Sequence, residues 1–115
     1  LITGSRNWPD PTPIVDAILS YTRNVPECEV TIVHGGCPDG ADAMANDIAE
    51  NFQWRVEIYP AKWWEYGKRA GYVRNAEMVK QGADICLAFI KDGSRGATMC
   101  ADLAEKAGIP VMRYR

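Results

Sequence analysis

Three short segments of the chain combine glycine with small polar or charged side chains. They are Gly4-Ser5-Arg6-Asn7-Trp8, residues 35–42, and Asp92-Gly93-Ser94-Arg95-Gly96-Ala97-Thr98. Glycine allows a backbone to pass close to a ligand and to present its N–H groups. The second and third segments each open an expected helix, whose free N–H groups and positive dipole end attract phosphate. The three segments therefore predict a site for an anion of the kind that a nucleotide carries.

Charged side chains in these segments could complete such a site. Arg6 and Arg95 can each donate bidentate, charge-assisted hydrogen bonds to a phosphate. Asp42 has two interpretations, because it could accept hydrogen bonds from ribose hydroxyls or lie exposed in the first turn of a helix.

A helical stripe later in the chain adds another cation. Arg74 and Asn75 share one helical face with Gly71 and Met78, because these positions are spaced at i, i+3, i+4 and i+7. If this face meets the end of the sheet, Arg74 and Asn75 are partly buried and need polar partners. A phosphate is one such partner, and a nearby carboxylate or a strand-end carbonyl is the alternative.

Two further features leave more than one interpretation open. His34 ends an expected strand, where it could form a structural hydrogen bond, transfer a proton or contact a ligand. Residues 61–69 form an expected loop in which Trp63, Trp64 and Tyr66 lie among lysine and arginine. We expect this loop either to close over a nucleotide as a lid, or to pack within the chain or at an oligomer interface.

Together these patterns predict ligand contacts from all three glycine-rich segments and from the helical stripe. The predicted contact residues are Gly4, Ser5, Arg6, Gly35, Gly36, Asp42, Arg74, Asn75, Gly93, Ser94, Arg95, Gly96 and Thr98. No residue receives a catalytic role from the sequence, and no cofactor is indicated. A metal site is not expected, because the cysteines lack C-x-x-C spacing and His34 is the sole histidine.

Strands and helices alternate along the chain and would bring these segments together. Apolar runs predict strands at 1–3, 30–34, 55–59, 84–90 and 111–114, and helical periodicity predicts helices at 13–24, 39–52, 71–81 and 98–106. Such alternation is typical of right-handed βαβ units. We therefore expect a single α/β Rossmann-like domain over residues 1–115, with a mostly parallel five-stranded sheet and helices on both faces. Ligands of such sheets bind at the carboxyl ends of the strands.

Composition narrows the class of protein and its partners. The net charge of −2 disfavours a nucleic acid partner, because proteins that grip a nucleic-acid backbone are usually basic. No apolar run approaches the roughly 20 residues of a membrane span, so no membrane partner is expected. Cys86 and Cys100 lie in apolar stretches, as reduced cysteines do in cytoplasmic proteins. We expect a cytoplasmic protein that binds a nucleotide-like small molecule and forms a homo-oligomer.

Several motifs stand in an order that resembles a known family. They are I-T-G-S-R-x-W at 2–8, V-H-G-G-x-x-x-G-A-D-x-x-A at 33–45, P-A-x-W at 60–63, G-K-x-A-G-x-x-R-N-x-x-M at 67–78, S-R-G-A-T at 94–98 and A-x-x-x-G-I-P-V at 104–111. Together they resemble the YspA-like branch of the SLOG superfamily. That superfamily includes LOG-type phosphoribohydrolases, Smf-type DNA-processing proteins and sensors of NAD-derived signals in antiphage systems. The resemblance implies a Rossmann-like fold and a nucleotide-like ligand.

A comparison with the LOG-type enzymes bears on catalysis. Those enzymes carry R-K-x-x-M and then P-G-G-x-G-T-x-x-E, and similar elements begin here at Arg74 and Gly93. When the two patterns are aligned on Gly96, Cys100 stands where the LOG-type enzymes have their catalytic glutamate. Asp102 is expected on another side of the helix. Cleavage of an N-glycosidic bond needs a carboxylate. We therefore expect binding or sensing of a phosphate-bearing nucleotide or of a small molecule derived from one, such as an NAD derivative. The first alternative is a nucleotide-processing hydrolase that cleaves an N-glycosidic or phosphate-ester bond through another acid, such as Asp42 or Asp92. The second is a single-stranded DNA-binding domain.

Overall fold

Short parallel strands alternate with helices in the computed structural model, which describes residues 1–115. The strands are β1 (Ile2–Gly4), β2 (Thr31–His34), β3 (Arg55–Ile58), β4 (Cys86–Phe89) and β5 (Val111–Tyr114). The helices are α1 (Pro11–Thr22), α2 (Ala41–Asn51), α3 (Trp63–Tyr66), α4 (Ala70–Gln81) and α5 (Arg95–Lys106), with 3-10 turns η1 (Glu27–Glu29) and η2 (Gly67–Arg69). Each expected strand and each expected helix is present, with ends shifted by a few residues, and the α/β class is confirmed.

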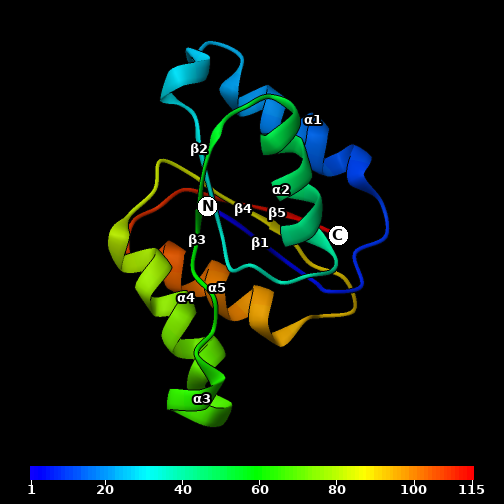
Figure 1. The fold of residues 1–115 in the computed structure, drawn as a ribbon. Coiled ribbons are helices and arrows are strands. Elements are labelled where there is room, and N and C mark those ends of the chain that lie inside the picture. The colour runs from blue at the N-terminus through cyan, green and yellow to red at the C-terminus, as the bar shows by residue number, and fades with distance from the viewer.

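The strands form two parallel sheets rather than one. β4 pairs with β1 and β5, whereas β2 pairs only with β3. The expectation of a single five-stranded sheet is therefore wrong. β1 and β2 are neighbours in space, but Figure 1 shows β2 and β3 running at a steep angle across the other strands. The strand twist, together with a β1 of only 3 residues, leaves no ladder between them, and a groove of about 460 Å³ lies there instead.

Helices cover both faces of the strands, as expected (Figure 1). On one face, Ile18 of α1 and Ile48 of α2 pack in one apolar cluster with Phe89 of β4. On the other face, Met78 of α4 and Cys100 of α5 are buried together. None of the helices has the length and hydropathy needed to cross a membrane. This layering leaves the carboxyl ends of the strands accessible between the two layers of helices.

Local capping explains where α1 begins, and two other segments differ from their sequence-based expectation. α1 starts at Pro11 because Asp10 is its N-cap and accepts a hydrogen bond from the Thr12 N–H at 3.0 Å, and proline suits the first helical position. α5 starts at Arg95, three residues before the start that its apolar periodicity indicates. Residues 61–69, expected to be a loop, contain the short helix α3 and the turn η2.

Candidate functional site

A cavity of about 770 Å³ opens at the carboxyl ends of the strands. The predicted contact residues that line it are Gly4, Ser5, Arg6, Gly35, Gly36, Asp42, Arg74, Asn75, Ser94 and Gly96. Gly93, Arg95 and Thr98 do not line it. Gly93 and Thr98 border a separate small pocket beside Arg115, and Arg95 is exposed at the start of α5. The three glycine-rich segments thus meet around one cavity.

The loop after β1 is held in place by Ser5. Its hydroxyl donates to the Lys91 carbonyl at 3.1 Å and accepts from the Lys91 N–H at 2.7 Å. Its backbone N–H donates to the Phe89 carbonyl at 2.9 Å. A Cβ on the neighbouring Gly4 would collide with the Cβ of Ala41, so glycine is needed for the start of α2 to approach β1. Ser5 is buried, and its side chain fixes the geometry of this wall.

His34 fixes the second wall, at the end of β2. Its Nδ1 accepts the Gly36 N–H at 2.9 Å, and its Nε2 lies 2.9 Å from the Asn46 amide oxygen. A neutral ring with its proton on Nε2 satisfies both contacts. The imidazole is buried and outside the cavity lining. Of the interpretations left open by the sequence, these contacts correspond to the structural hydrogen bond.

Arg74 joins α4 to the end of β2. Its Nη1 donates to the Gly35 carbonyl at 2.8 Å, and its Nε donates to the Asn75 side-chain oxygen at 2.7 Å. The Asn75 amide nitrogen in turn donates to the Gly96 carbonyl at 3.3 Å. A Cβ at Gly35 would collide with the Arg74 guanidinium, which explains the glycine. The strand-end carbonyl expected as an alternative partner is thus present, and Nη2 makes no hydrogen bond within the protein.

Asp42 places a buried carboxyl group in the cavity wall. It is only 7% exposed, so it is not an exposed acid of the first turn of α2. Burial raises the pKa of this carboxyl group above its ordinary value, and the N–H groups of Cys37 and Gly35 and the charge of Arg74 oppose that rise. The Cys37 N–H donates to Oδ2 at 3.3 Å. Asp42 can therefore offer an acceptor or, when protonated, a donor to a ligand.

The two helices that begin at the cavity differ in how their first turns are used. At α2, the Ser5 carbonyl accepts the Ala41 N–H at 3.3 Å, and the Asp42 carboxyl group occupies the first turn. At α5, the side chain of Ser94 makes no capping bond, and the N–H groups of Gly96 and Ala97 have no acceptor within the protein. At α2 the N–H groups of Asp42 and Ala43 also lack an acceptor within the protein, but α5 has no acidic residue in its first turn. The start of α5 is therefore the more favourable of the two for an anion.

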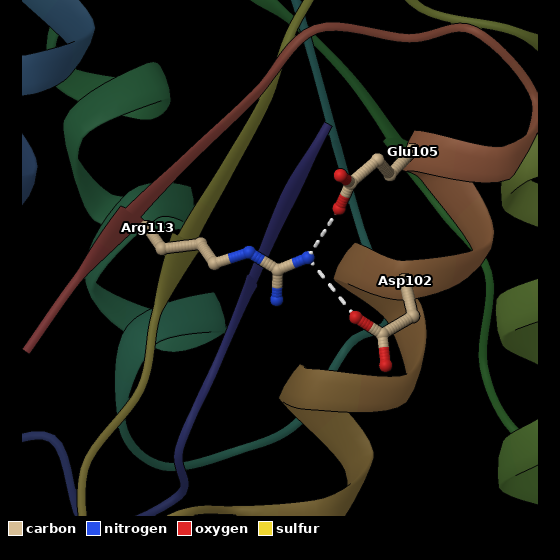
Figure 2. A network of polar contacts seen from close by, with 3 residues as sticks. All are labelled: Asp102, Glu105 and Arg113. Atoms are coloured by element: carbon tan, nitrogen blue, oxygen red, sulfur yellow. Dashed lines mark hydrogen bonds and ion pairs between the residues drawn. The ribbon is translucent and has the colours of Figure 1, made fainter.

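No carboxylate of α5 faces the cavity. Cys100 is fully buried and does not line it, and burial raises the pKa of its thiol. Asp102 faces another side of the helix, as expected, where its Oδ1 lies 3.0 Å from Nη2 of Arg113. The same Nη2 lies 2.7 Å from the Glu105 carboxylate (Figure 2). Asp102 is thus part of an ion-pair group between α5 and β5.

Several lining residues were not selected from the sequence. Asn7, Lys91 and Asp92 border the cavity, and the Asn7 amide donates to the Asp92 carboxylate at 3.4 Å. Their place directly after β1 and β4 was the available signal, because the residues after parallel strands share one edge. Trp63 of α3 also lines the cavity while remaining 51% exposed.

Comparison with known proteins shows which family the chain belongs to. Residues 1–66 match the model of the YspA, cpYpsA-related SLOG family. The Gene 61 protein of Mycobacterium phage D29 is 44% identical over 119 residues, which cover 99% of this chain and 94% of the phage protein. No solved structure gives a significant match. The chain belongs to the YspA, cpYpsA-related SLOG family, as its motifs indicated.

Proposed function

We propose that the cavity binds a phosphate-bearing nucleotide, or a small molecule derived from one such as an NAD derivative, and that the protein senses or sequesters it. The observation that carries the proposal is the meeting of three different groups around one cavity. They are the open N-terminus of α5, the guanidinium of Arg74 and the buried carboxyl group of Asp42. Phosphate suits the first two groups, and a ribose hydroxyl suits the third.

The positions of these groups suggest how a nucleotide lies. The Gly96 and Ala97 N–H groups, together with Nη2 of Arg74, would contact the phosphate. Asp42 would contact the ribose, because it lies on the α2 side of the cavity. Trp63 has an exposed ring at the rim and would stack on the base. Membership of a SLOG family supports a nucleotide-related ligand, and the buried thiols of Cys86 and Cys100 suit a protein of the reducing cytoplasm.

A thermal-shift panel tests this proposal. It contains mononucleotides, NAD, ADP-ribose and cyclic nucleotides, with inorganic phosphate as a control for simple anion binding. A ligand at 100 times its Kd adds about 2.7 kcal/mol of stability, which for a domain of this size raises Tm by roughly 10 °C. The proposal fails if no member of the panel shifts Tm and mass spectrometry finds no co-purified nucleotide.

A hydrolase is the second candidate, and Asp42 is the residue that favours it. Its carboxyl group has a raised pKa and lines the cavity, which suits a general acid. Because α5 directs no carboxylate into the cavity, we expect no cleavage of AMP to adenine and ribose 5-phosphate at an enzymatic rate. Chromatography after overnight incubation tests this expectation. Turnover that disappears in Asp42→Asn or Asp92→Asn would establish the hydrolase instead.

A further inference from the structure

β3 is an edge strand with nothing paired to its outer side. Its one hydrogen-bonded neighbour is β2, and in Figure 1 no helix or strand crosses in front of it. Arg55, Glu57 and Ile58 are exposed, and Ile58 reaches 51%. Unpaired N–H and C=O groups at a sheet edge recruit further strands, and proteins often prevent this with lysine, proline or a covering element. β3 contains neither lysine nor proline, and its two charged residues, Arg55 and Glu57, are of opposite sign and so do not repel a second copy of the strand in every register.

The ladder between β2 and β3 determines which backbone groups of β3 face outward. The Tyr59 N–H donates to the His34 carbonyl at 2.9 Å. Alternate residues of a strand direct their N–H and C=O groups to opposite edges. Arg55 and Glu57 therefore bond toward β2, and the backbone groups of Val56 and Ile58 point to the open edge.

We propose that two copies of the chain pair through β3, antiparallel about a two-fold axis, with Val56 opposite Val56 of the partner subunit. The two Val56 residues then exchange N–H···O=C bonds in both directions. The Ile58 N–H meets the carbonyl of Trp54 of the partner subunit, and symmetry repeats this contact. The result is about four backbone hydrogen bonds. The Trp54 N–H takes no part, because it already donates to the Ala49 carbonyl at 2.9 Å.

Charge complementarity favours this register over its neighbours. With Val56 at the two-fold axis, Arg55 lies opposite Glu57 of the partner subunit, and the same pair recurs by symmetry. Opposite charges facing each other across an antiparallel pair stabilise it, and like charges destabilise it. A register centred on Glu57 would bring two carboxylates together, and one centred on Arg55 would bring two guanidinium groups together.

The same pairing covers exposed apolar surface. Val56 and Ile58 point to one face of the sheet, and Ile58 would lie beside Trp54 of the partner subunit. Phe52, which is 38% exposed, stacks on Trp54 at 4.8 Å between ring centroids and would join this contact. Pairing also joins the two-stranded sheets of the copies into one continuous sheet, and sheets of more strands are the more stable arrangement.

Sedimentation velocity over a series of protein concentrations tests the interface. We expect wild-type protein to form a dimer reversibly. Glu57→Arg places Arg55 opposite an arginine at both symmetric positions, and we expect it to weaken dimerisation at least about tenfold. The double variant Arg55→Glu with Glu57→Arg restores the opposite charges, and it should return the dimer to within about threefold of wild type. Asp16→Arg, on the exposed side of α1, makes the same change in net charge and should have no effect.

Each outcome decides the matter once circular dichroism has shown that the variants are folded. Wild-type protein that sediments as a monomer at every concentration overturns the proposal. A dimer that is insensitive to Glu57→Arg, or one that the double variant fails to restore, overturns this interface. The sedimentation experiment uses protein without nucleotide. Failure of the proposed dimer interface would therefore leave the proposal for nucleotide binding untouched.

Discussion

Replacing Arg74 with alanine tests the proposed site at the side chain that joins α4 to the end of β2. The side chain donates to the Gly35 carbonyl and to the Asn75 amide oxygen at 2.8 and 2.7 Å. Loss of a donor costs about 1–3 kcal/mol for each acceptor left unsatisfied. Both acceptors border an open cavity, where water can replace the donor, so the lower figure applies and the total is about 2 kcal/mol. We expect Tm to fall by roughly 5–10 °C while the protein stays folded.

The effect of this change on binding is separable from its effect on stability. Loss of charge-assisted hydrogen bonds from Arg74 to a phosphate should cost about 1.5–3 kcal/mol, or about 10- to 150-fold in Kd. Arg74→Lys should recover little, because an ammonium group does not reproduce a bidentate fork. Calorimetric titration with the nucleotide that gives the largest thermal shift measures both variants. Arg113→Ala is the matched control, because Arg113 is bonded to Asp102 and Glu105 outside the cavity.

Gly96→Val probes the same contact from the side of the α5 N-terminus. No protein atom other than its chain neighbours and the backbone of α5 lies within 4 Å of a Cβ built at Gly96, so we expect the fold to tolerate the substitution. The valine would keep a phosphate away from the N–H groups of the first turn, and affinity should fall. If folded Arg74→Ala and Gly96→Val both bind nucleotide with unchanged affinity, Arg74 and the start of α5 belong to the scaffold alone.

Three further predictions concern the protein without ligand. Burial raises the pKa of Asp42, so its contribution to stability is present below its unfolded pKa of about 3.9 and is lost as pH rises through the folded pKa. Unfolding measured across this range should show a flatter pH dependence for Asp42→Asn. Cys86, whose pKa burial raises to about 12, and the buried Cys100 should resist alkylation in the native protein while the exposed Cys28 reacts, as mass spectrometry would detect. Gly4→Val should lower Tm by about 4–8 °C or more, through overpacking of about 1–3 kcal/mol against the start of α2.

The residue patterns predicted several of the residues that line the cavity, but they did not predict the angle between the two sheets. The spacing of Arg74 and Asn75 placed both on the helical face that meets the cavity. Alternation of elements identified the parallel strands, but each apolar run reports only on its own strand. The separation of β2 and β3 from the other strands depends on the twist between strands and on the shortness of β1. The short α3 was missed for another reason, because its 4 residues are too few for helical periodicity to appear.

The unequal ends of α2 and α5 are the part of the site that no local pattern could distinguish. Both helices follow glycine-rich turns, and both could have offered N–H groups to phosphate. The Ser5 carbonyl, from a loop far away in the sequence, occupies the start of α2, and the Asp42 carboxyl group adds an acid there. The acid makes the start of α2 less favourable for an anionic phosphate than the start of α5. The Arg74 guanidinium is bonded to Gly35 at the end of β2 and is linked to Gly96 of α5 through the Asn75 amide. In the complex that we propose, this asymmetry would orient the nucleotide with its phosphate at α5 and its sugar at α2, so substitutions at Gly96 and at Asp42 should affect contacts to different parts of the nucleotide.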